Sequence, residues 1–191
     1  MNLSEYTNNY FEKLNQILHL VDKDSIEVFV KLLDEARRKD LNIFFIGNGG
    51  SAATASHFAN DLSFGSGQDI KSFRAISLVD NVAINTALSN DYGFETSFAK
   101  QISVYGKEKD ILVSISASGN SKNLISAIKL AKNLGMVSIS ITAFDGGEVK
   151  RLSDFNIHFP TEIGDYGRAE DAHMILDHLV SNYFRDRKNI D

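Results

Sequence analysis

From Asp40 onward, short and mostly apolar runs alternate with stretches of helical periodicity, and this alternation restricts the fold more than any other feature. Small polar residues or glycine follow most of the runs, and the only proline, Pro160, follows the last. Strands that are apolar along their length, rather than at every second position, are typical of a parallel sheet covered on both faces. The sequence therefore predicts a doubly wound α/β fold with a five-stranded parallel sheet and helices on both faces. The predicted strands span residues 43–46, 75–79, 111–115, 137–141 and 156–159.

Helical patterns separate these runs, and two further helices precede them. Apolar residues recur at three-to-four-residue spacing from Tyr6 to Leu18 and again from Ile26 to Ala36. We expect these two helices, within residues 1–40, to form an antiparallel pair outside the sheet. No repeat, low-complexity tract or linker interrupts the chain, so residues 1–191 are expected to form a single domain. The helices predicted after residue 40 span 52–62, 82–88, 94–105, 121–134, 147–152 and about 169–184.

Composition and charge exclude several classes of function. The formal net charge of −5 leaves no basic patch to neutralise a nucleic-acid backbone, so we expect no nucleic-acid partner. Cysteine is absent, which excludes disulfides, thiolate catalysis and cysteine metal cages. The N-terminal segment is polar and amphipathic, and no apolar window reaches the length of a membrane span. We therefore expect a cytoplasmic protein with no membrane association.

A glycine-rich loop follows the first predicted strand. It reads Gly47-Asn48-Gly49-Gly50-Ser51 and runs directly into a predicted helix. Glycines let the backbone approach a ligand closely, and a helix N-terminus offers unpaired N–H groups to an anion. The alternative is a tight strand-to-helix turn in which Ser51 only caps the helix.

A serine-rich loop follows the third predicted strand. Ser116, Ser118 and Ser121 precede a helix that begins near Lys122, and their hydroxyls can converge on one dianion without a lysine or arginine. The loop lacks the GK[ST] ending of a Walker motif, and GxGxxG does not occur, so we expect no nucleotide or redox cofactor. Helix capping is again the alternative, but two such loops at the ends of two strands favour an anion site.

Histidines and carboxylates are concentrated in two helical segments. His57 and Asp61 are four residues apart and share a helix face, while Glu170, Asp171, His173, Asp177 and His178 crowd the last helix. If the segments meet, two histidines and two carboxylates can bind a zinc-like ion or act as acid and base; otherwise they are surface pairs. Glu170 and His178 would stand about 12 Å apart along a continuous helix. Glu170 must then lie at a frayed start, or one of the two serves another subunit's site.

Together these motifs resemble those of phosphoheptose isomerases, a branch of the sugar-isomerase (SIS) family. The resemblance covers nearly the whole chain. It rests on GNGGS, on SxSGNS, on the segments Asn90–Phe94 and Thr142–Gly147, and on Arg168 followed by Glu170 and two histidines. It implies an SIS domain that isomerises sedoheptulose 7-phosphate to D-glycero-D-manno-heptose 7-phosphate for the heptose of a bacterial lipopolysaccharide or capsule. Some related SIS proteins bind a protein partner without catalysis, so the fold alone does not establish an enzyme.

The resemblance also assigns roles to residues. It implies Asp61 and His178 as the catalytic pair, and one zinc ion per site held by His57, Asp61, Glu170 and His178. It further implies a homotetramer whose first helices lie in the subunit interface and whose sites draw on more than one chain. The residues implied to bind the substrate are Asn48, Gly49, Gly50, Ser51, Asp61, Asn90, Asp91, Ser116, Ala117, Ser118, Ser121 and Glu170.

Four positions depart from the family pattern. Asp61 replaces a glutamate, Glu170 replaces a glutamine, Ala117 replaces a threonine and Gly65 replaces an arginine. The shorter Asp61 reaches less far, so the alternative is that Glu170 is the base and Asp61 only a ligand. Two functions also remain open: a sugar-phosphate-sensing or partner-binding module, and an isomerase of another ketose phosphate. Segments 64–71 and 162–166 are expected to select the length of the sugar.

Overall fold

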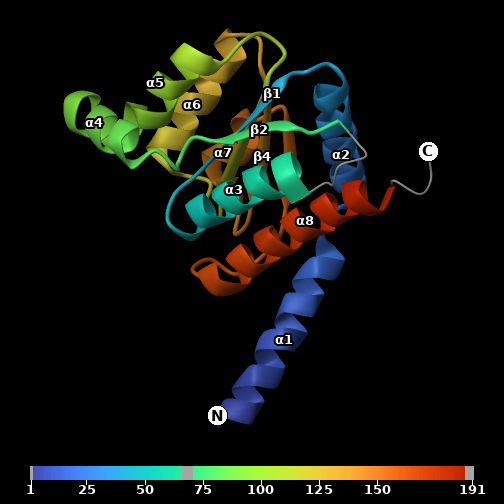
Figure 1. The fold of residues 1–191 in the computed structure, drawn as a ribbon. Helices are drawn as coiled ribbons and strands as arrows, with labels where there is room; N and C mark the ends of the chain where they lie inside the picture. The colour runs from blue at the N-terminus through green and yellow to red at the C-terminus, as the bar shows by residue number, and fades with distance from the viewer. Residues whose placement is uncertain (1, 66–70, 188–191) are drawn as a thin grey trace.

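A five-stranded sheet forms the centre of the protein, whose computed structural model describes residues 2–65 and 71–187. All strand pairs are parallel, and the order is β2-β1-β3-β4-β5 (Figure 1). Each strand lies on an apolar run named above, which confirms the predicted doubly wound sheet. The strands are β1 (Asn42–Gly47), β2 (Arg74–Ser77), β3 (Ile111–Ser116), β4 (Val137–Thr142) and β5 (Phe155–His158).

Helices connect and cover the strands, close to the predicted positions. The stretch 94–105, predicted as one helix, is a 3-10 turn followed by a separate α-helix. A π-helical turn, η1, directly continues the helix that follows β1. Among the described residues, no helix is long and apolar enough to cross a bilayer. The elements are α1 (Leu3–Leu20), α2 (Lys23–Arg38), α3 (Gly50–Asn60), η1 (Asp61–Gly65), α4 (Val82–Tyr92), η2 (Phe94–Thr96), α5 (Ser97–Tyr105), α6 (Lys122–Asn133), α7 (Gly147–Leu152) and α8 (Tyr166–Asp186).

The two faces of the sheet bury separate apolar cores. Ile43 and Phe45 of β1 pack in the core shared with α2, α3 and α8. The alternate residues Phe44 and Ile46 pack in the core shared with α5, α6 and α7. Successive strand side chains point to opposite faces, so an unbroken apolar run fills both cores. This explains the unbroken apolar run of β1, whereas β4 alternates and buries Ser138 and Ser140 between its apolar residues.

The N-terminal helices do not form the predicted antiparallel pair. Instead, α2 packs on the sheet and buries Phe29, Leu33 and Ala36 in the core. Helix α1 contacts α8 and runs away from the rest of the molecule (Figure 1). The prediction was wrong because the apolar side of α2 covers the sheet. That side of α2 is therefore not available to pack against α1.

The inner side of α8 carries polar as well as apolar residues. His173, Asp177 and Ser181 are buried there beside Leu176 and Phe184. Buried polar groups are costly unless they are hydrogen-bonded or paired with charge. Two of these residues consequently affect the behaviour of the protein, His173 through stability and Asp177 through the site described below.

We expect stability to fall in acid because of His173. Its fully buried ring lies against Phe159, and burial lowers the pKa of His173 to about 4, outweighing an opposing contribution from the Thr142 backbone. The unfolded chain, with an ordinary histidine pKa near 6.5, therefore binds the extra proton first. The contribution of His173 alone to the free energy of unfolding should fall by about 3 kcal/mol between pH about 6.5 and about 4. The raised pKa of Asp177 acts in the opposite direction over the same range, so the contribution of His173 is the difference between the pH profiles of wild type and a variant without the histidine.

Chemical denaturation across this pH range measures the effect. The His173→Leu variant should lose that part of the pH dependence, whereas His19→Gln, at an exposed position on α1, should retain it. Burial also lowers the pKa of His158, so some slope should persist in the leucine variant. Equal slopes in wild type and His173→Leu would show that His173 is not the titrating group.

Candidate active site

Two loops lie side by side at the carboxyl edge of the sheet. Strands β1 and β3 are neighbours, and Gly47 at the end of β1 pairs with Ile115 near the end of β3. The glycine-rich loop and the serine-rich loop therefore start from adjacent positions. In an open parallel sheet this edge is where ligands bind.

The glycine-rich loop leaves the N-terminus of α3 open. Gly49, with φ of 54°, is the N-cap, and no side chain caps the helix. The alternative in which Ser51 serves as the cap is wrong, because Ser51 already lies inside the helix and is buried. A Cβ at Gly47 would stand 2.4 Å from the Ser51 carbonyl oxygen, so only glycine permits this approach. The first N–H groups of α3 are thus available to an anion.

The serine-rich loop holds its hydroxyls through acceptor contacts. Ser116 Oγ accepts from the Gly119 N–H at 3.0 Å, and Ser118 Oγ accepts from the Asn120 N–H at 3.4 Å. Ser121 is the N-cap of α6, yet its side chain makes no capping hydrogen bond. Each hydroxyl therefore keeps a proton to donate to an anion. Ala117 packs with Ala143, Phe144 and Ala169, so its side chain is structural.

An amide pair locks the two loops together. Asn48 Nδ2 donates to Asn123 Oδ1 at 3.0 Å, and Asn123 Nδ2 donates back to Asn48 Oδ1 at 2.9 Å. Asn123 is buried and its Oδ1 also accepts from the Leu124 N–H. Neither loop can shift without breaking this pair. Sequence reasoning included Asn48 but missed Asn123, because nothing in the sequence links the two asparagines.

Helices α3 and α8 bring a histidine and carboxylate cluster together. Ligand atoms of His57, Asp61, Asp177 and His178 all lie within 4.8 Å of one another. The Nε2 atoms of His57 and His178 face each other at 3.2 Å, and His57 Nε2 is 3.4 Å from Asp61 Oδ2. The His57 side chain is 44% exposed, so the cluster is open to solvent on one side. Such an arrangement can bind a metal ion and leave a position for a substrate.

Asp177 is the member of the cluster that sequence reasoning did not select. Its side chain is fully buried, and its Oδ2 lies 4.0 Å from His57 Nε2. Ser181 donates to Oδ1 at 3.1 Å, whereas Oδ2 has no hydrogen-bond partner in the part of the chain that the structure describes. Burial raises the pKa of Asp177 to about 7, and the nearby Asp61 carboxylate adds to the rise against the effects of Ser181 and His178. The signal in the sequence was an acidic residue on the helix face that also carries the apolar residues Leu176 and Val180.

Glu170 lies outside this cluster. It belongs to the continuous helix α8, after its first turn rather than at a frayed start. A Cβ built on Gly50 would stand 2.3 Å from the Glu170 carboxyl carbon, which places this carboxylate against the glycine-rich loop. The structure therefore unites three of the four predicted metal ligands and puts the fourth at the predicted anion site.

Asn90 and Asp91 come from a further element, helix α4. They are exposed near the end of α4, where Asn90 Nδ2 donates to Asp91 Oδ1 at 2.8 Å. Helix α4 packs against η2 and α5 (Figure 1). Within the described residues, neither makes a hydrogen bond to the loops or to the cluster. Part of the predicted size-selecting segment 64–71 lies outside the described residues.

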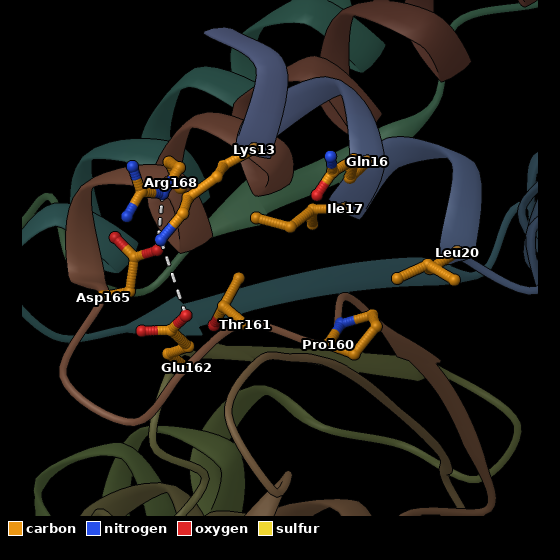
Figure 2. Close-up of a pocket in the computed structure, with 9 residues that line it drawn as sticks. All are labelled: Lys13, Gln16, Ile17, Leu20, Pro160, Thr161, Glu162, Asp165 and Arg168. Atoms are coloured by element: carbon orange, nitrogen blue, oxygen red, sulfur yellow. Dashed lines mark hydrogen bonds and ion pairs between the residues drawn. The ribbon is translucent and has the colours of Figure 1, made fainter. Parts of the chain in front are cut away.

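A separate hollow lies between α1 and the chain that leads into α8. Its volume is about 160 Å³. Figure 2 shows both of its cations facing carboxylates: Lys13 Nζ lies 3.6 Å from Glu162, and Arg168 Nε donates to Asp165 at 2.6 Å. These ion pairs lie where α1 meets the rest of the protein. Among the described residues that line the hollow, both cations are already paired with carboxylates, so the hollow is not suited to a phosphate. It is lined by Lys13, Gln16, Ile17, Leu20, Pro160, Thr161, Glu162, Asp165 and Arg168.

The sequence and the fold match characterised proteins along most of the chain. Residues 6–143 match the family model described as the SIS domain. The chain is 39% identical over 158 residues to a phosphoheptose isomerase of Helicobacter pylori strain P12, covering 83% of this chain and 81% of that protein. It is 36% identical over 180 residues to phosphoheptose isomerase 1 of Campylobacter jejuni, covering 94% and 95% of the two chains.

Solved structures agree with these matches. A phosphoheptose isomerase from Neisseria gonorrhoeae superposes with a TM-score of 0.86 at 29% identity and covers 97% of this chain and 100% of its own. A phosphoheptose isomerase from Francisella tularensis gives a TM-score of 0.87 at 28% identity with the same coverage. The sequence motifs, the two open loops at the sheet edge and these matches place the chain in the phosphoheptose isomerase family of SIS-domain proteins.

Proposed function

We propose that this chain is an aldose–ketose isomerase that converts sedoheptulose 7-phosphate into D-glycero-D-manno-heptose 7-phosphate. The product would supply heptose for a bacterial lipopolysaccharide or capsule, and the enzyme would act in the cytoplasm. One observation carries the proposal: helices α3 and α6, which follow the neighbouring strands β1 and β3, both start without a side-chain cap, in a chain that also holds an open histidine and carboxylate cluster. The first feature suits a phosphate, and the second suits proton transfer.

Binding would be concentrated at the phosphate. Ser116, Ser118 and Ser121 would donate their hydroxyl protons, and the N–H groups at the start of α3 would add to them. Hydrogen bonds that are remote from the reacting carbons orient the substrate, so their energy contributes to the chemical step. Glu170, at the edge of this cradle, would accept from sugar hydroxyls.

Proton transfer would involve Asp61 and His178. The base, Asp61, removes the C1 proton of the ketose, an enediol forms, and the same proton returns to C2. His178 exchanges protons with the two oxygens as the carbonyl moves from C2 to C1. Asp61 begins the π-helical turn η1, an irregularity that is frequent at functional sites.

The cluster also fits a divalent cation such as zinc. The two facing Nε2 atoms and the unpartnered Asp177 Oδ2 are the donors that such an ion binds. His57, Asp61 and His178 would hold it, whereas Glu170, the fourth donor expected from the family, lies at the glycine-rich loop of the same chain. The ion would stabilise the negative charge that develops on the enediol oxygens. Its affinity should fall in acid, because the imidazoles must be neutral and the carboxylates ionised to bind it.

The direct test is incubation of the purified enzyme with sedoheptulose 7-phosphate and detection of the aldose. Pentulose and hexulose phosphates should be run in parallel, since a phosphate cradle does not measure the length of the sugar. We expect conversion of the seven-carbon substrate at the highest rate. A faster reaction with a shorter ketose would reassign the substrate, and binding without any conversion would favour a sensing module.

We further propose a homotetramer in which α1 lies between subunits. Leu3, Phe11 and Leu20 of α1 are exposed, and the helix runs away from the body (Figure 1). A helix with this much uncovered apolar surface needs a partner. A second copy would also help to complete the site, because Gly50 and Asp61 are about 16 Å apart along the helix.

Light scattering on the purified protein should give the mass of a tetramer at micromolar concentration. Phe11→Glu combined with Leu20→Glu should reduce that mass, because the charges would be buried against another subunit. The matched control is Val104→Glu, at an exposed position on α5. A wild-type monomer would contradict the proposal.

A further inference from the structure

We propose that Asp177 is a metal-binding residue of this chain, with its Oδ2 as the fourth donor beside His57, Asp61 and His178. This inference rests on the metal centre of the proposed function and changes one of its donors. The family pattern assigns that position to residue 170. Four features of the structure favour Asp177 instead.

Two separations between donor atoms of the cluster match those around a tetrahedral zinc ion. Around a tetrahedral zinc ion with bonds of 2.0–2.1 Å, neighbouring donor atoms are about 3.3–3.4 Å apart. The separation of the two Nε2 atoms is 3.2 Å, and that between His57 Nε2 and Asp61 Oδ2 is 3.4 Å. Asp177 Oδ2 is 4.0 Å from His57 Nε2 and within 4.8 Å of the other donors. A small rotation of the Asp177 side chain would bring Oδ2 to the distance of a fourth ligand, and a substrate oxygen could then bind as a fifth.

Asp177 is a buried carboxylate with few hydrogen bonds. A fully buried carboxylate needs a cation or several hydrogen bonds, and here only Ser181 donates to it, at Oδ1. The other oxygen has no hydrogen-bond partner among residues 2–65 and 71–187 and belongs to the cluster formed with His57, Asp61 and His178. A divalent cation at that point would compensate the buried charge. A leucine or isoleucine would pack on this helix face at lower cost, so a ligand explains the aspartate better than packing does.

Glu170 lies away from the cluster in the same chain. It lies on the same continuous helix as His178, about 12 Å away along the axis. Its carboxylate contacts the glycine-rich loop at Gly50 instead. Within one chain, Glu170 is therefore placed to meet the sugar phosphate, and Asp177 is placed to meet the metal.

Asp61 has a shorter side chain than the glutamate of the family. It is one methylene shorter than the glutamate of the family, so it brings its charge less far from α3. Asp177 approaches from α8, on the other side of the cluster, and supplies a second carboxylate at the same point. Two neutral imidazoles and two carboxylates together neutralise a divalent cation. The departure at Asp61 and the aspartate at position 177 thus compensate each other.

The experiment measures metal binding in the absence of sugar. Metal-free protein is titrated with zinc against a chromophoric chelator for wild type, Asp177→Asn and Glu170→Gln. Asp177→Asn should weaken zinc binding by about 100-fold or more, since even indirect partners of a ligand contribute 10- to 100-fold. Glu170→Gln should keep an affinity near that of the wild type. Titration with cobalt(II) should show a tetrahedral absorption band in wild type that is altered only in the Asp177 variant.

Several outcomes would overturn the inference. Unchanged affinity in Asp177→Asn would do so, as would a loss confined to Glu170→Gln, which would make Glu170 the donor. Wild-type protein that binds no zinc would also refute it, while the sedoheptulose assay would judge the isomerase separately. If the asparagine variant misfolds, Asp177→Leu decides by thermal unfolding. Removing an unpaired buried carboxylate should make metal-free Asp177→Leu at least as stable as wild type, and zinc should no longer stabilise it.

Discussion

Replacing Asp61 by asparagine should reduce turnover by about 10²- to 10⁴-fold, the range expected when a general base is removed. The substitution keeps the shape of the side chain, so the fold and the phosphate cradle should persist. The loss should therefore fall on kcat, with KM for the sugar phosphate nearly unchanged. Bound zinc must be measured in the same samples, because Asp61 also lies within the metal cluster.

The Glu170→Gln variant is the matched control for this assignment. It restores the family residue, and its carboxylate lies at the glycine-rich loop rather than in the cluster, so it should remain active. An inactive glutamine variant together with an active asparagine variant would make Glu170 the base. Normal turnover in both variants would leave the cluster without a catalytic role and would favour the sensing module.

Removing two hydroxyls from the serine-rich loop should have the second-largest effect. The double variant Ser118→Ala/Ser121→Ala should raise the KM by about 100-fold or more, because each hydrogen bond to a charged group contributes about 1.5–3 kcal/mol. Ser116 is left in place because its buried Oγ accepts the Gly119 N–H at 3.0 Å, so its loss would disturb the loop itself, whereas the contact of Ser118 Oγ with the Asn120 N–H is exposed and longer, at 3.4 Å. Neither Ser118 nor Ser121 makes a side-chain contact on which the core depends.

Initial rates over a wide range of substrate concentration measure this effect, and thermal unfolding checks the fold. Ser103→Ala, which removes a hydroxyl at an exposed position on α5, is the control and should behave as wild type. An unchanged KM in the double variant would show that the phosphate does not bind at this loop.

The sheet could be predicted from the sequence because its signal is local. The run from Ile43 to Ile46 is apolar at every position, and only a strand covered on both faces uses such a run. The two loops could be predicted for the same reason, since glycines and serines directly follow strands. Pairing of β1 with β3 then brings the loops together without further information.

The remaining features depend on contacts that the sequence does not encode locally. The packing of α2 on the sheet was missed because helical periodicity shows that a helix has an apolar side but not what covers it. Asp177 was missed because its role depends on where α3 crosses α8. Glu170 was placed at the metal by family pattern, whereas the length of α8 separates it from His178.

The attachment of α1 determines which part of the molecule opens first. Within the described residues, α1 is held from Tyr10 onward, through Tyr10 against Asp171 and Arg168, Lys13 against Glu162, and the buried Ile17. A helix of this length is marginal without packing, so amides before Tyr10 should exchange with deuterium far faster than those of α8. In an assembly that covers α1, the same amides should become protected, and dilution should expose them again. Hydrogen exchange at the first turns of α1 would therefore report the state of assembly while the catalytic sheet stays folded.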